Sequence, residues 1–106
     1  MSSIRDRQEG FEKKFAMDEE SKFKAMARRN KLLGLWAAEK LGKAGADADA
    51  YAKEVVRADF EEAGDNDVFR KVRADFDVAG VAQSDLQIRG VMDELLVTAV
   101  EQIRKT

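Results

Sequence analysis

Residues 23–42 decide the fold class, and they read FKAMARRNKLLGLWAAEKLG. Large apolar side chains recur there at three- and four-residue spacing; they are Phe23, Met26, Leu33, Ala37 and Leu41, with Leu32 and Trp36 widening the stripe. This spacing places them on one side of an α-helix. Gly42 and Gly45 follow, and glycine accepts the left-handed turn that ends many helices. The stretch therefore predicts one long amphipathic helix over 23–41.

Three further segments show the same periodicity, over 47–63, 66–79 and 85–104. Asp47 and Asp65 are expected to cap the first two, and Ser84 with Gln87 has the spacing of a capping box. Their expected core residues are Ala52, Val56, Phe60 and Ala63; then Phe69, Val72, Phe76 and Ala79; then Ile88, Met92, Leu95, Ala99 and Ile103. The chain has no proline and no stretch that alternates with period two. We expect an all-α protein, a small four-helix bundle over 23–106.

A five-residue motif, VRADF, occurs twice, at 56–60 and again at 72–76. Each copy is followed by Ala-Gly, at Gly64 and Gly80. A sixteen-residue period is too short for a helical solenoid repeat. We therefore expect two consecutive helices that end alike, each burying a phenylalanine, Phe60 or Phe76, one turn before a glycine.

The absence of cysteine and histidine from the 106 residues excludes most catalytic chemistry. No thiol nucleophile, histidine base or His/Cys zinc site can be built. Acidic residues such as Asp59 and Asp75 are expected on solvated faces or in salt bridges to Arg57, Arg70 or Arg73. EF-hand loops starting at Asp47 or Asp65 fail at their sixth and twelfth positions, so we expect no metal, no cofactor and no catalytic residue.

Phosphate and nucleic-acid sites are weakly supported. The loop from Gly42 to Gly45 lacks the Walker spacing. Five basic residues between Lys22 and Lys31 would attract nucleic acid, but the net charge of the whole chain is -2. We expect no nucleic-acid partner. Weak nucleotide binding at a helix start stays open, and a nucleotide-binding or sensing bundle with no inhibitory role is the alternative function.

Residues 1–22 differ from the rest of the chain. Beyond Met1, their large apolar side chains are only Ile4, Phe11, Phe15 and Met17, too few to offset the entropy of ordering the segment. Phe11 and Phe15 lie one helical turn apart and are edged by basic residues, namely Arg5, Arg7, Lys13 and Lys14. We expect a mobile, amphipathic N-terminal arm that becomes helical in the groove of a protein partner.

The stretch NKLLGLWAAEKLG at 30–42 closely resembles the zeta-subunit family, the alphaproteobacterial inhibitors of F-type ATP synthase. The resemblance extends to FA at 15–16, FKA at 23–25, Tyr51, ADFEEAGD at 58–65, DV at 67–68, RKV at 70–72 and MDELL at 92–96. It implies a four-helix bundle with a mobile N-terminal segment, in agreement with the periodicity.

The resemblance also implies a function. Family members insert their N-terminal helix at a catalytic α/β interface of the synthase head, near the central stalk, and block ATP hydrolysis. Carried over by position, the inhibitory arm comprises Ile4, Arg5, Arg7, Phe11, Lys13, Lys14 and Phe15. Phe23, Lys24, Arg28 and Arg29 form a secondary docking surface. The chain would then be a non-catalytic inhibitor in the cytoplasm, without membrane insertion, since it also has no export signal or apolar span.

Overall fold

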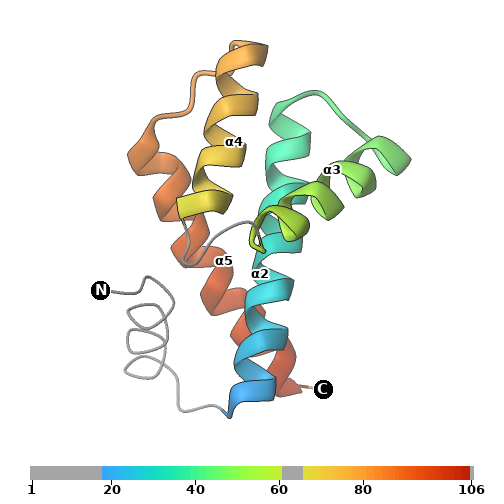
Figure 1. Cartoon of the computed structure of the whole chain (residues 1–106), viewed down its shortest axis with the longest axis vertical. Helices are drawn as coiled ribbons and strands as arrows, with labels where there is room; N and C mark the ends of the chain where they lie inside the picture. The colour runs from blue at the N-terminus through green and yellow to red at the C-terminus, as the bar shows by residue number, and fades with distance from the viewer. Residues whose placement is uncertain (1–17, 61–65, 106) are drawn as a thin grey trace.

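The computed structural model describes residues 18–60 and 66–105. Within them the chain forms four helices and no strand: α2 at Glu19–Lys40, α3 at Gly45–Ala58, α4 at Asn66–Ala79 and α5 at Asp85–Lys105 (Figure 1). The all-α, four-helix prediction is confirmed. No helix in the described ranges is long and apolar enough to cross a membrane.

The four helices alternate in direction, and two of them are much longer than the others. In Figure 1, α2 runs upward and α5 runs back down beside it, while α3 crosses the upper half of α2 obliquely and α4 stands next to α5. The lower ends of α2 and α5 extend beyond both short helices. We call these ends, residues 19–30 and 96–105, the stalk, and the remainder the body.

The apolar core divides in the same way. The body core joins all four helices, with Leu33, Tyr51, Val72, Phe76 and Ile88 among its buried members. The stalk core comes from α2 and α5 alone: Ala25, Met26 and Val100 are buried, with Leu96 and Ile103 packed against them. Trp36 meets Phe76 edge to face, with ring centroids 5.6 Å apart. Helix α4 therefore packs against the tryptophan of α2.

Two helices begin a few residues before their approximate predicted ranges. Helix α2 begins at Glu19 rather than 23, because Asp18 accepts a hydrogen bond from the backbone of Ser21 and caps it. Helix α3 begins at Gly45, so Asp47 lies in its first turn, and the N-cap residue, Ala44, makes no side-chain bond. Asp65 lies outside the described residues. The other two helices match their predicted ranges to within one residue.

The two VRADF copies differ in burial, which contradicts the expectation that they end alike. Phe76 is 0% exposed, whereas Phe60 is 68% exposed. Helix α3 ends at Ala58, so Phe60 follows its last turn, while α4 continues past Phe76 to Ala79. Gly80 has φ 71, as a glycine that ends a helix requires. Gly64 lies outside the described residues.

Several other predicted core positions also shift. Phe23 is exposed, because α5 is the neighbour that packs against the start of α2 and Phe23 lies off that contact. Val55 replaces Val56 as the buried valine of α3. Ala79 is exposed at the end of α4. Three predicted core residues are only half-buried, namely Phe69, Leu95 and Ile103. Five are buried as predicted, namely Ala52, Val72, Ile88, Met92 and Ala99. Ala63 lies outside the described residues.

Candidate functional site

The predicted site falls into two parts. The arm residues lie outside the described residues; they are Ile4, Arg5, Arg7, Phe11, Lys13, Lys14 and Phe15. The predicted secondary docking residues all lie on α2 within the stalk, immediately after the arm; they are Phe23, Lys24, Arg28 and Arg29.

A side-chain cap fixes where α2 begins. The Asp18 Oδ1 accepts a hydrogen bond of 2.7 Å from the Ser21 backbone N–H. This bond stabilises the carboxylate and lowers the pKa of Asp18 below its ordinary 3.8. Glu19 and Glu20 add negative charge in the first turn, where the helix dipole favours it. The arm therefore joins the bundle at a well-defined point.

Three of the four docking residues are at the surface of the stalk. Phe23 is exposed, although aromatic side chains of its size are usually buried. The Lys24 ammonium lies 3.1 Å from the Glu20 carboxylate one turn earlier. The Arg28 guanidinium donates a hydrogen bond of 3.2 Å to Gln102 of α5. An exposed aromatic ring is thus followed along α2 by two exposed basic side chains, Lys24 and Arg28.

Arg29 does not lie on that surface. It is 1% exposed, and its Nε donates a hydrogen bond of 2.8 Å to Asn30 Oδ1. The sequence predicted a basic docking residue here, but the side chain lies inside the fold. A solvated charge was expected because arginine is rarely buried. We therefore leave Arg29 out of the docking surface.

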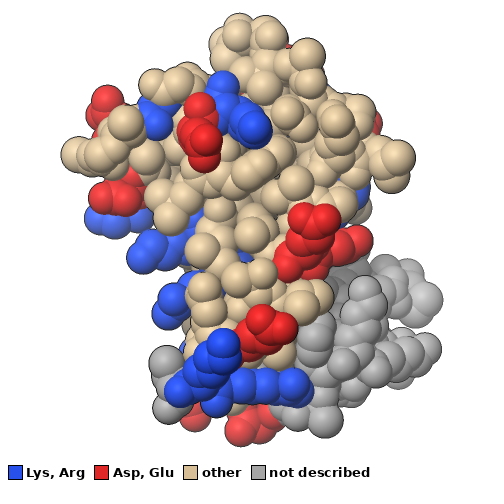
Figure 2. Space-filling model, turned by 180° about the vertical axis from the view of Figure 1, so that it is seen from behind, with Lys and Arg blue, Asp and Glu red and all other residues tan. Residues whose placement is uncertain are grey.

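Charges are mixed on the face seen from behind (Figure 2). Lysine and arginine gather along the left edge and at the lower end, with acidic side chains between them, while the top and the upper right of the face are mainly uncharged. Within the described residues no three Asp or Glu side chains gather as a metal site would require.

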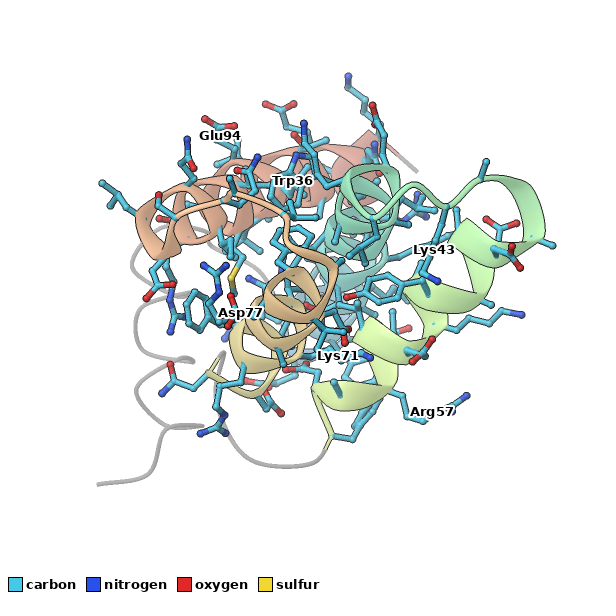
Figure 3. All side chains as sticks on the ribbon, turned by 90° about the horizontal axis from the view of Figure 1, so that it is seen from above. Trp36, Lys43, Arg57, Lys71, Asp77 and Glu94 are labelled. Atoms are coloured by element: carbon cyan, nitrogen blue, oxygen red, sulfur yellow. The ribbon has the colours of Figure 1, made fainter. Side chains whose placement is uncertain are left out.

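A polar network joins α3 to α4. The Tyr51 hydroxyl donates a hydrogen bond of 2.7 Å to Asp75 Oδ2. The Lys71 ammonium lies 2.9 Å from the same carboxylate and 3.1 Å from Glu54, at the junction of the two helices (Figure 3). Lys71 and Lys43 also approach the Tyr51 ring, at 5.1 and 6.0 Å from its centroid. Burial, and then the bond to Asp75, raise the pKa of Tyr51 above its ordinary 10.0.

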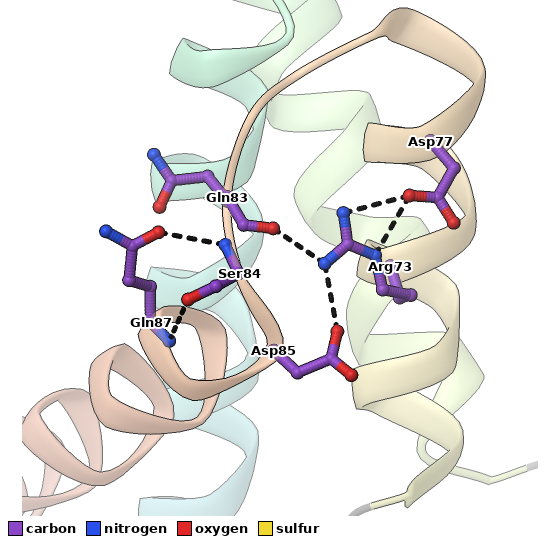
Figure 4. Close-up of polar contacts among 6 residues, drawn as sticks. All are labelled: Arg73, Asp77, Gln83, Ser84, Asp85 and Gln87. Carbon is purple, nitrogen blue, oxygen red and sulfur yellow. Dashed lines mark hydrogen bonds and ion pairs between the residues drawn. The ribbon is translucent and has the colours of Figure 1, made fainter.

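A second network joins α4 to the start of α5 (Figure 4). The Arg73 guanidinium lies 2.9 Å from Asp77 and 3.0 Å from Asp85, and it donates a 2.6 Å hydrogen bond to the Gln83 carbonyl. The pKa of Arg73 is raised, and the hydrogen bond to Asp85 contributes most to this shift. Beside it, the Ser84 backbone N–H donates to Gln87 Oε1, and the Gln87 N–H donates to Ser84 Oγ. The predicted capping box is confirmed.

Both networks depend on pairs that the sequence interpretation did not identify. Asp75 was expected on a solvated face or in a salt bridge to an arginine, but it binds Lys71 four residues earlier. Arg73 binds Asp77 four residues later. Opposite charges four residues apart on a helix are the signal that would have revealed these pairs.

A comparison of the sequence with models of known protein families identifies its family. The sequence model of the family described as ATPase inhibitor subunit zeta matches residues 1–102. The chain therefore belongs to the ATPase inhibitor zeta family. A role as an ATPase inhibitor follows from that membership, and the match includes the arm and all of the stalk up to residue 102.

Solved structures share this architecture. Three chains of known structure match. One of them, determined by solution NMR, is 52% identical, and the match covers 78% of this chain and 94% of that one with a TM-score of 0.70. No curated protein matches the chain. The architecture of this chain is thus similar to that of a solved protein with 52% sequence identity.

Proposed function

We propose that this chain is a non-catalytic inhibitor of F-type ATP synthase, in which the arm residues before the Asp18 cap insert at a catalytic α/β interface of the head beside the central stalk. The inserted helix blocks ATP hydrolysis. The observation that carries the proposal is the family match, which begins at residue 1 and so includes the arm. The site of action is the cytoplasmic face of the inner membrane, where the chain is held by its partner.

The arm has the chemistry that such a cleft requires. An interface that opens and closes in each turnover stops when a helix occupies it. Phe11 and Phe15, with Ile4 further out, supply apolar anchors whose burial favours binding. Arg5, Arg7, Lys13 and Lys14 supply positive charge for acidic groups of the cleft. None of these roles requires a catalytic side chain in the inhibitor.

The stalk continues this surface into the bundle. Phe23, Lys24 and Arg28 repeat the combination of an apolar ring with basic neighbours, and they lie within three turns of the Asp18 cap. Because α2 runs without a break from Glu19 to Lys40, a stalk bound to the head also fixes the direction of the body. We assign the stalk surface the docking role, without Arg29.

Nucleotide binding finds no specific support at the start of α5. Arg73 is the cation beside that helix start, and Asp77, Asp85 and the Gln83 carbonyl already bind it. Because the Arg73 charge is already paired within the fold, we do not propose a phosphate site there.

Substitutions in the full-length chain test the division between arm and stalk. Phe11→Ser/Phe15→Ser should abolish inhibition of ATP hydrolysis by the isolated catalytic head while leaving the circular dichroism of the helices largely unchanged. Phe23→Ser should weaken binding but leave full inhibition at saturating inhibitor. Phe60→Ser, at an exposed apolar position outside the stalk, is the control. Unchanged inhibition by the double arm variant would refute the proposal.

A further inference from the structure

The turn between α4 and α5 carries two exposed apolar side chains, one before and one after an uncharged stretch of sequence. From Val78 to Ser84 the sequence VAGVAQS has no charged residue. Val78 is 90% exposed and Leu86, one residue into the first turn of α5, is 82% exposed. We call residues 78–86 the corner. In Figure 1 it lies at the upper end of the molecule, away from the stalk.

The corner is held rigidly. Gly80 takes its left-handed conformation, and the Val81 N–H donates a 2.9 Å hydrogen bond to the Phe76 carbonyl, which closes the end of α4. The reciprocal bonds of Ser84 and Gln87 close the start of α5. Arg73 ties the two helix ends together through Asp77 and Asp85 (Figure 4). A partner would meet Val78 and Leu86 already in position, so little backbone entropy is lost on binding.

Charge at the edge of the corner limits what binds there. Asp77 precedes Val78 and Asp85 precedes Leu86, and both carboxylates are largely exposed. The Arg73 guanidinium donates hydrogen bonds to the Oδ1 atoms of both carboxylates. Together, the guanidinium and the two carboxylates carry one net negative charge. The complementary surface is an apolar depression with lysine or arginine at its rim.

The size of the corner argues against a second copy of this chain as the occupant. A stable protein interface buries about 800 Å² on each partner. One valine, one leucine and the neighbouring alanines supply only a fraction of that area. The corner therefore fits a secondary contact within a larger interface, one in which other parts of the chain also bind.

We infer that the corner is a second anchor on the catalytic head, inserted into a basic-rimmed apolar depression distant from the cleft that receives the arm. This inference rests on the proposed function. Helix α2 is about 33 Å long at 1.5 Å per residue, so the corner contacts the head far from the Asp18 cap. Two linked contacts bind more tightly than either alone, because the second forms at high effective concentration.

Serine substitutions in the full-length chain test the apolar contact. Val78→Ser/Leu86→Ser should weaken binding to the isolated catalytic head by about tenfold or more, while Phe60→Ser, at an exposed position outside both the stalk and the corner, changes it little. Inhibition at saturation should remain, because the arm is intact. Equal affinity of the corner variant and the unaltered chain overturns the inference and leaves the proposed function standing. No binding by the unaltered chain overturns both. A concentration-dependent dimer that the corner variant abolishes also overturns it, in favour of a second copy.

Charge substitutions test the basic rim separately from helix stability. Val78 is near the C-terminal end of α4 and Leu86 near the N-terminal end of α5, so the helix dipoles favour lysine at 78 but glutamate at 86. A basic rim instead disfavours lysine at both positions. We expect Val78→Lys to bind more weakly than Val78→Glu, and Leu86→Lys more weakly than Leu86→Glu. Opposite orders at the two positions, parallel to melting temperature, contradict the basic rim.

Discussion

Gly34 of α2 and Ala52 of α3 cross so closely that a Cβ on Gly34 would stand 2.5 Å from the Ala52 Cα. No real Cβ tolerates that distance to backbone, so α3 reaches this position only because residue 34 is glycine. Gly34 lies in the middle of the sequence stretch that resembles the zeta family. That stretch is therefore explained by packing: its glycine admits α3, and its tryptophan supports Phe76 of α4.

Alanine at the two helical glycines should have opposite effects. Gly34→Ala forces α2 and α3 apart and should lower the free energy of unfolding by about 1–3 kcal/mol. Gly90→Ala on α5, whose Cβ would meet nothing within 4 Å, should raise it by up to about 1 kcal/mol. Urea unfolding monitored by circular dichroism measures both. Equal effects would mean that the close crossing is absent in solution.

The two VRADF phenylalanines should differ in energy as they differ in burial. Phe76→Ala removes a fully buried ring and should cost about 3–5 kcal/mol of stability. Phe60→Ala should stay within about 0.5 kcal/mol, because its ring is exposed. Phe76→Ala should also change the fluorescence of Trp36, the sole tryptophan. Similar losses at both positions would restore the expectation of two equivalent helix ends.

Tyr51 should ionise only above its ordinary pKa. Burial and the bond to Asp75 raise the pKa of Tyr51 in the folded chain, while the unfolded chain ionises near 10.0. The network's contribution to stability is therefore complete below pH 10.0 and lost as pH rises above it. Tyr51 is the one tyrosine, so phenolate absorbance reports it directly. Asp75→Asn should bring the titration to lower pH, and an ordinary titration in the unaltered chain would disprove the buried bond.

The Asp18 cap should lose its effect in acid. Its folded pKa is lowered below 3.8, so the cap stabilises α2 above that pH and the effect disappears as pH falls through the folded pKa. Asp18→Ala should therefore lower the melting temperature at pH 7 and make progressively less difference below pH 3.8. Glu20→Gln, in the same turn but not the capping position, is the control. A melting-temperature difference that stays constant down to strongly acidic pH would contradict the cap.

Periodicity was sufficient to predict the four helices, because each buries one apolar stripe and is followed by a turn. It could not predict how much of each stripe finds a neighbour. Phe23 has the right spacing but lies where α5 does not cover it, and Phe60 falls after the last turn of α3. Arg29 is the opposite case: a charged side chain that was expected at the surface is buried within the fold. The burial of each of these side chains depends on which helices pack together. The spacing of apolar residues along a single helix does not specify that packing.

The candidate site was predictable only as far as local sequence extends. The capping box at Ser84 follows from four adjacent residues, and it was predicted correctly. The corner was not foreseen, because Val78 and Leu86 belong to different helices and their exposure depends on how α4 and α5 end. Arg73 joins those ends through residues four and twelve positions away, beyond the reach of the local pattern.

The most direct test is the rate of ATP hydrolysis by the isolated catalytic head, titrated with the full-length chain and with a chain that lacks residues 1–15. We expect the full-length chain to reduce hydrolysis to a low plateau, and the truncated chain to bind through the stalk and corner without reducing it. Full inhibition by the truncated chain, or no inhibition by the complete one, would contradict the account.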